Sequence, residues 1–167
     1  LLGLAVAAAG PVDAFAAGTQ HRSERVLPRF AGPRLGGGFL SSDLLKGRRG
    51  LVYVFATTDR SAAEMARLVQ RLSPDASAAN IAILGVNRDL NPAQVEPFVG
   101  EYLPELPVII DTDLTITHKL QVPPGESAVF LIDAEGFILA GFAGMPERID
   151  DPAAVYEAEF RNLLHLP

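Results

Sequence analysis

A buried strand that runs directly into an amphipathic helix is predicted by residues 50–72, GLVYVFATTDRSAAEMARLVQRL. Residues 51–57 are rich in β-branched and aromatic side chains, which favour a strand. After them, apolar side chains recur at helical spacing, at Met65, Leu68, Val69 and Leu72. Because this strand-to-helix corner is the best specified turn of the chain, we expect the rest of the fold to be organised around it.

The corner, residues 57–61, carries side chains that can satisfy the first N–H groups of a helix. Thr58 or Asp59 can cap the first turn, and Ser61 with Glu64 has the spacing of a capping box. A helix N-terminus also offers free N–H donors and a partial positive charge to a ligand. The chain contains no cysteine, however, so the corner cannot hold a thiolate, a disulfide or a thiolate-bound metal.

Length and charge limit the classes of partner. A chain of 167 residues suits one domain, with a core large enough to be stable without disulfides or a structural metal. Lys and Arg total 14 against 20 Asp and Glu, for a net charge of -6. The densest basic stretch, residues 22–34, is rich in Gly and Pro and offers only Phe30 for base stacking. Nucleic acid is therefore not an expected partner.

The first residues have the pattern of an export signal. An apolar run over residues 1–9 precedes Ala14-Phe15-Ala16, a small-x-small pattern typical of a cleavage site. The run is shorter than the roughly 20 residues that a membrane span needs, and a lipoprotein anchor would require a cysteine. We expect residues 1–16 to be a truncated signal and the protein to be exported, to a bacterial periplasm or a comparable compartment. The alternative is an Ala-rich helix packed on the domain.

The remaining pattern predicts an α/β domain over residues 39–167, preceded by an extended lead-in over residues 17–38. Residues 80–87 form a second buried strand after a helix-length crossover, which implies a parallel pair. Asp133-Ala134-Glu135-Gly136 joins the last two strands as an antiparallel hairpin. The expected further strands are 107–111, 127–132 and 137–142, and the expected helices are 61–73, 91–102, 114–120 and 150–164.

Several short motifs occur in an order that is known from one family. They are residues 54–58 (VFATT), 63–65 (AEM), 84–87 (LGVN) with Asp89, 107–111 (PVIID) and 130–133 (FLID) with Gly136. Together they resemble the thioredoxin-like fold of the redoxin group, which includes TlpA-like thiol-disulfide oxidoreductases and the peroxiredoxins of the alkyl hydroperoxide reductase family. The likeness covers roughly residues 33 to 165. It implies a central mixed sheet of about five strands with helices on both faces.

The sequence departs from this family where the family carries its chemistry. Counting back from Glu64 places Thr58 and Ser61 at the two cysteine positions, whereas counting forward from Phe55 places Asp59 and Ala62 there. A match of residues 61–64 to the peroxiredoxin pattern Cys-Thr-x-Glu would make Ser61 the replacement of the peroxidatic cysteine. Serine cannot act in its place, because its hydroxyl stays protonated near neutral pH.

A second departure concerns the cis-proline of the family, which faces the cysteines and exposes backbone groups to a bound peptide. It stands three residues before the Phe-Leu-Ile-Asp signature, a position that Ser127 occupies here, although Pro123 and Pro124 are close by. A cis bond before a residue other than proline costs about 2.5–4 kcal/mol, so we expect the Glu126–Ser127 bond to be trans. The resemblance, without thiols or cis-proline, implies that dithiol exchange has been lost.

Other chemistry has weak support in the sequence. The histidines, His21, His118 and His165, lack metal-ligand spacing, and no Gly-x-Ser-x-Gly elbow is present. Asp59 and Arg60 are expected to form a solvated ion pair. Three acidic residues near strand ends are expected to act in turns and helix caps: Asp111, Asp113 and Asp133. We predict no catalytic residue, metal or cofactor.

These observations favour a redox-inactive, exported domain that binds a protein or an extended peptide by strand-like pairing. The predicted binding face is the former active-site corner and the proline loop: Thr57, Thr58, Asp59, Arg60, Ser61 and Ala62, with Pro124, Gly125, Glu126 and Ser127. One alternative is altered catalysis, through a partner's cysteines or through Ser61 or Asp59 in a non-redox reaction. Another is a structural subunit that displays residues 17–38. The partner and the oligomeric state stay open.

Overall fold

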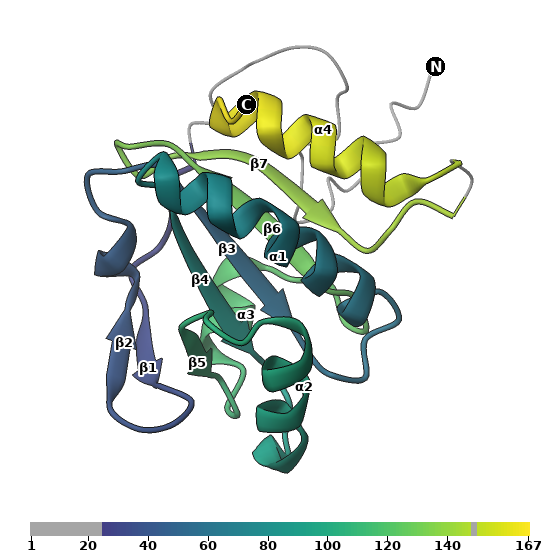
Figure 1. Ribbon diagram of the computed structural model, residues 1–167. Coiled ribbons are helices and arrows are strands. Elements are labelled where there is room, and N and C mark those ends of the chain that lie inside the picture. Colours follow the sequence, from purple (N-terminus) through teal and green to yellow (C-terminus); the bar gives the residue numbers. More distant parts are fainter. Residues whose placement is uncertain (1–24, 148–149) are drawn as a thin grey trace, which may run out of the picture.

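A five-stranded mixed sheet forms the centre of the computed structural model, which describes residues 25–147 and 150–167 (Figure 1). The strand order is β5-β4-β3-β6-β7. The strands of this sheet are β3 (Gly50–Phe55), β4 (Ala82–Asn87), β5 (Val108–Ile110), β6 (Ala128–Ile132) and β7 (Ile138–Ala143). The helices are α1 (Ala62–Ala78), α2 (Val95–Tyr102), α3 (Thr115–Leu120) and α4 (Pro152–Leu164), with short 3-10 turns η1 (Ser42–Leu45) and η2 (Pro92–Gln94).

Strand β3 is the central strand and is buried along its whole length. It pairs in parallel with β4 and antiparallel with β6, while β6 and β7 form an antiparallel hairpin. The predicted parallel pair and the predicted hairpin are both confirmed. The predicted fold class, an α/β sheet of about five strands with helices on both faces, is also confirmed.

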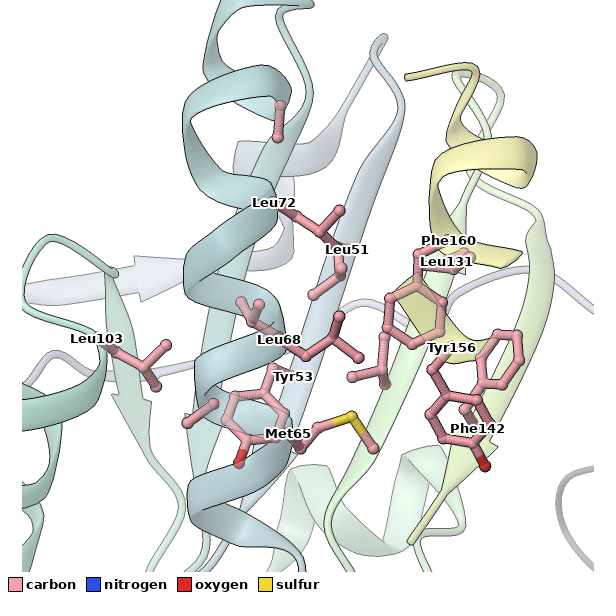
Figure 2. Packing of buried hydrophobic residues seen from close by; sticks show 14 of the residues in the cluster. Leu51, Tyr53, Met65, Leu68, Leu72, Leu103, Leu131, Phe142, Tyr156 and Phe160 are labelled. Carbon is pink, nitrogen blue, oxygen red and sulfur yellow. The ribbon is translucent and has the colours of Figure 1, made fainter. Parts of the chain in front are cut away.

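Alternate residues of β3 point to opposite faces of the sheet, as the two-residue period of a strand requires. Leu51 and Tyr53 pack in one cluster with side chains of α1, α2 and α4. Figure 2 shows Leu51, Leu68 and Leu72 of this cluster between β3 and α1. Val52 and Val54 face the other side, where α3 and η1 cover the sheet. Three helices therefore cover one face, and α3 with the N-terminal segment covers the other.

A small antiparallel hairpin lies beside the edge strand β5 (Figure 1). It consists of β1 (Ala31–Pro33) and β2 (Phe39–Ser41). The Leu35 N–H donates to the carbonyl of Val108 at 2.9 Å, and Phe30 is buried in the core. The later part of the expected lead-in thus packs on the sheet, while the division at residue 38 stays a prediction. The expected signal over residues 1–16 lies outside the described residues.

Helix α1 is longer than the sequence pattern predicts. The prediction ended it at residue 73, but it continues to Ala78 with Pro74 inside it. The continuation buries Ala76, and the Ile81 N–H donates to the Ala76 carbonyl at 2.8 Å. Tertiary packing therefore outweighs the helix-breaking tendency of proline here.

Candidate functional site

The carboxylate of Asp59 is the centre of a buried polar cluster at the corner between β3 and α1. Its Oδ2 accepts hydrogen bonds from the Ala56 N–H at 2.7 Å and from the Ser127 hydroxyl at 3.2 Å. Its Oδ1 accepts from the Arg88 guanidinium at 2.7 Å, and only 3% of the Asp59 side chain is exposed. The predicted solvated ion pair between Asp59 and Arg60 is therefore wrong, because Asp59 pairs with Arg88 instead.

Arg88 connects the three segments that meet at this edge of the sheet. It follows β4, and its N–H donates to the Phe55 carbonyl at 2.8 Å. One nitrogen of its side chain, Nη2, donates both to Asp59 and to the Glu126 carbonyl, at 2.7 and 3.0 Å. The side chain is 10% exposed, and its Nε has no hydrogen-bond partner among the described residues. Arg88 thus holds the corner and the proline loop together.

Asp89 fixes the start of the corner. Its carboxylate accepts from the Thr57 N–H at 2.9 Å and from the Thr57 hydroxyl at 3.2 Å. Asn87 donates to the same carboxylate from its side-chain amide at 2.7 Å. Both side chains are buried at the end of β4, so the first residue of the corner is tied to the neighbouring strand.

Ser61 stands at the N-cap position of α1 but does not cap the helix with its side chain. Its hydroxyl oxygen is buried and has no partner in the described part of the chain. The Ala62 N–H donates to the Asp59 carbonyl at 3.1 Å instead. The backbone of Ser61 (φ -104°, ψ 9°) lies outside the extended region that a side-chain cap needs. The predicted capping box of Ser61 and Glu64 is therefore wrong.

Tyr53 lies beneath the corner and bonds strand β3 to the first residue of α1. Its hydroxyl donates to the Ala62 carbonyl at 2.7 Å. Burial raises the pKa of Tyr53 well above its usual range, and the charge of Asp59 raises it further. The phenol therefore stays protonated and acts as a structural donor.

The proline loop brings Ser127 against the corner. The Glu126–Ser127 bond is trans, as predicted, and no peptide bond in the described residues is cis. The Ser127 carbonyl accepts from the Gly144 N–H at 2.8 Å, while its buried hydroxyl donates to Asp59. The family resemblance places the proline opposite the cysteines, so this contact favours Asp59 and Ala62 as the residues at the former cysteine positions.

The ten predicted face residues divide between the surface and the interior. Thr58, Arg60, Pro124 and Gly125 are exposed, while Thr57 and Glu126 are partly exposed. The others are buried: Asp59, Ser61, Ala62 and Ser127. The predicted face is thus a surface of exposed loop residues above a closed polar cluster.

Two features beside this face were missed by the sequence analysis. Leu90, next to Asp89, is 76% exposed, an unusual degree for a leucine. Arg60 forms an exposed ion pair with Glu147, with 2.6 Å between Nη1 and Oε1. The exposure of Leu90 had no signal in the sequence, because it depends on how the loop after β4 folds.

The acidic residues that were predicted to act in turns and caps do so. Asp111 accepts from the Ile116 and Thr117 N–H groups at 3.0 and 2.8 Å, which caps α3. Asp113 and Asp133 accept from the N–H groups two residues after them, at 3.0 Å each. These predictions are confirmed.

The histidines in the described part of the chain lie in separate elements. His118 lies in α3 and His165 follows α4, whereas His21 lies outside the described residues. Within residues 25–147 and 150–167, no group of three or more potential ligands could hold a metal ion.

A cavity of about 440 Å³, bordered by Asp43, Lys46 and Ile132, lies at the other end of the sheet. None of the described helices is long and apolar enough to cross a membrane.

Solved structures with a similar fold include proteins described as a thiol:disulfide interchange protein, a disulfide oxidoreductase and a peroxidoxin. A Chlorobium tepidum protein assigned as the thiol:disulfide interchange protein DsbE superposes with a TM-score of 0.70 at 18% identity, over 87% of this chain and 99% of that one. A secreted Mycobacterium tuberculosis disulfide oxidoreductase gives 0.67 at 16% identity, over 81% and 94% of the two chains. The peroxidoxin BcpB of the same organism gives 0.66 at 16% identity, over 84% and 97%.

These superpositions show a thioredoxin-like fold. Comparison with curated protein sequences gives no match. A family model does match: that of the AhpC/TSA family covers residues 24–140, which is most of the chain. The protein therefore belongs to the AhpC/TSA family, and it is a member without cysteine.

Proposed function

We propose that this protein is a redox-inactive, exported member of its family that binds a protein or an extended peptide. The binding face is the corner, residues 57–62, together with the proline loop, residues 124–127. The observation that carries this proposal is the buried contact of Asp59 with Arg88 and Ser127. A fixed, fully paired carboxylate stands at one of the positions where the family resemblance can place a reactive thiol.

The burial of the polar groups at the corner argues against altered catalysis. A nucleophile or general base must reach its substrate. The Asp59 carboxylate is 3% exposed and bonded through both oxygens, and the Ser61 hydroxyl oxygen is buried with no base bonded to it among the described residues. A contribution to thiol chemistry through a partner's cysteines would still require the binding face, so it is a variant of the same proposal.

The surface above the cluster supports a binding role. Thr58, Pro124 and Gly125 are exposed on the two loops, and the exposed Leu90 lies beside the corner. An exposed large apolar side chain next to a loop with accessible backbone suits an extended segment, which could combine main-chain hydrogen bonds with one apolar contact. Export is supported by the small-x-small pattern of Ala14-Phe15-Ala16, and one protein of similar structure is described as secreted.

Affinity capture with matched variants tests the proposal. The immobilised protein is incubated with extract of the native extracytoplasmic compartment, alongside Thr58→Arg and Ser77→Arg. Thr58 is exposed on the proposed face, whereas Ser77 is exposed near the far end of α1, so both variants add the same charge and bulk. A partner retained by the wild type and by Ser77→Arg but lost by Thr58→Arg supports the proposal. A partner retained equally by all three, or insulin reduction by the protein above a blank, contradicts it.

A further inference from the structure

Two loops that are distant in the sequence are joined by one buried polar connection. Asp59 belongs to the corner, and Ser127 ends the proline loop. They are linked directly, by the Ser127 hydroxyl on Asp59 Oδ2 at 3.2 Å. They are linked a second time through Arg88, whose Nη2 donates to Asp59 Oδ1 and to the Glu126 carbonyl. The connection therefore has two parallel routes that share one carboxylate.

This connection holds the C-terminal end of the proline loop, together with the Gly144 N–H, which donates to the Ser127 carbonyl at 2.8 Å. Val122 is bonded to the end of α3, its N–H donating to the Thr117 carbonyl at 3.2 Å, and β6 begins at Ala128. Between these points Pro124 and Gly125 are exposed, and Gly125 has a φ of +75°. A short exposed segment of this kind is held in one place mainly by the contacts at its end.

We propose that Asp59, Arg88 and Ser127 form a latch that fixes the spacing between the two loops of the binding face. This inference rests on the proposed function, because it assigns Arg88 as a positioning residue for that face. Without the latch, the proline loop would sample several positions while the sheet stays folded. A binding face ordered in advance loses less conformational entropy when an extended segment binds.

Arg88 is suited to this role by the way it bonds. Both of its contacts use the same nitrogen, so a single ammonium group could make them with two of its three donors. The latch therefore predicts that Arg88→Lys keeps the connection, whereas Arg88→Met removes the Glu126 contact and leaves Asp59 without its counter-ion. If Arg88 only filled space, Arg88→Met should disturb the loop less than Arg88→Lys, because Met is as apolar as the stem of Arg and brings no charge into the site.

Amide hydrogen exchange of the free protein tests the latch without any partner. In Arg88→Met we expect exchange of the Gly144 amide, which reports on the loop through its bond to the Ser127 carbonyl, to rise about tenfold or more by local opening that changes little with urea. Any rise at Val52 and Tyr53 in β3 should instead follow the loss of global stability and steepen with urea. In Arg88→Lys, exchange at the loop should stay within about threefold of the wild type. Unchanged exchange at Gly144 in Arg88→Met, or a rise there with the same urea dependence as in β3, would overturn the proposal.

Ser127→Ala provides a second test if Arg88→Met does not fold. This variant removes only the direct hydrogen bond to Asp59, so exchange of the Gly144 amide should rise severalfold with β3 unaffected. No rise at the loop would overturn the latch. Because these readings need no partner, a failed capture experiment with loosened loops would reject the proposed function and leave the latch standing. A partner retained on the proposed face, with unchanged exchange at the loop in the variants, would support the proposed function and reject the latch.

Discussion

Asp59 and Arg88 are in ion-pair contact, with 2.7 Å between Oδ1 and Nη2, although 29 positions separate them in the sequence. The two side chains are 3% and 10% exposed, so both charges are largely removed from water. Buried pairs of this kind recover little net free energy beyond their desolvation cost, but breaking one leaves an uncompensated charge. The pair therefore defines the geometry of the corner more than it adds to the stability of the fold.

Removal of one partner should be costly. Asp59→Ala is expected to lower the free energy of unfolding by about 3–5 kcal/mol, because Arg88 stays buried without its counter-ion. Urea denaturation measures the change. The control is Arg60→Ala, which breaks the exposed pair with Glu147 and should cost about 0–1 kcal/mol. Equal losses in the two variants would show that the Asp59–Arg88 pair is not effectively buried.

Removal of both charges should cost less than the two single changes added together. In Asp59→Leu with Arg88→Met no unpaired charge remains, so we expect the loss in the double variant to fall below the sum of the single losses by about 1–3 kcal/mol. Urea denaturation of the single and double variants gives the coupling free energy between the two side chains. Additive losses would mean that the two side chains act independently.

Tyr53 should make the fold sensitive to alkaline pH. Its pKa is raised by burial above the usual value of about 10. Above that pH the unfolded chain loses the phenolic proton while the folded chain keeps it, so stability present at lower pH is lost at up to about 1.4 kcal/mol per pH unit. Tyr53→Phe should have a lower stability at pH 7, by about 1 kcal/mol, and a shallower decline above pH 10. Identical alkaline slopes for the two proteins would contradict this explanation.

Pro74 should weaken α1 at an exposed position. A proline inside a helix removes one hydrogen bond and crowds the carbonyl four residues earlier, here that of Gln70. Pro74→Ala is expected to raise the free energy of unfolding by about 1–3 kcal/mol. Gly100→Ala in α2, where no heavy atom lies within 4 Å of the added Cβ, is the comparison and should gain about 0.5–1 kcal/mol. A destabilised Pro74→Ala would show that the proline fits its place better than alanine.

The elements of the fold were predictable because their signals are local. Strand β3 and the start of α1 follow from apolar periodicity within residues 50–72, and Asp111 caps a helix that begins only a few positions later. The continuation of α1 past Pro74 was not predictable, because it depends on the burial of Ala76 against the rest of the core.

The chemistry of the corner was only partly predictable. The missing thiols are visible in the sequence, but the partner of Asp59 is not, since Arg60 is adjacent and Arg88 becomes a neighbour only when β4 pairs with β3. The failed cap at Ser61 was not predictable from residue type. The correct residue type stands at the N-cap position, but its backbone (φ -104°, ψ 9°) is not extended, and the hydroxyl does not cap.

The most direct test of the proposed binding face is hydrogen exchange of the protein with and without the captured partner. Protection on binding is expected to be concentrated in residues 57–62 and 124–127, with smaller changes around Leu90. Protection confined to other surfaces, such as the hairpin of β1 and β2 or the cavity beside Lys46, would contradict it and place the interaction elsewhere on the fold.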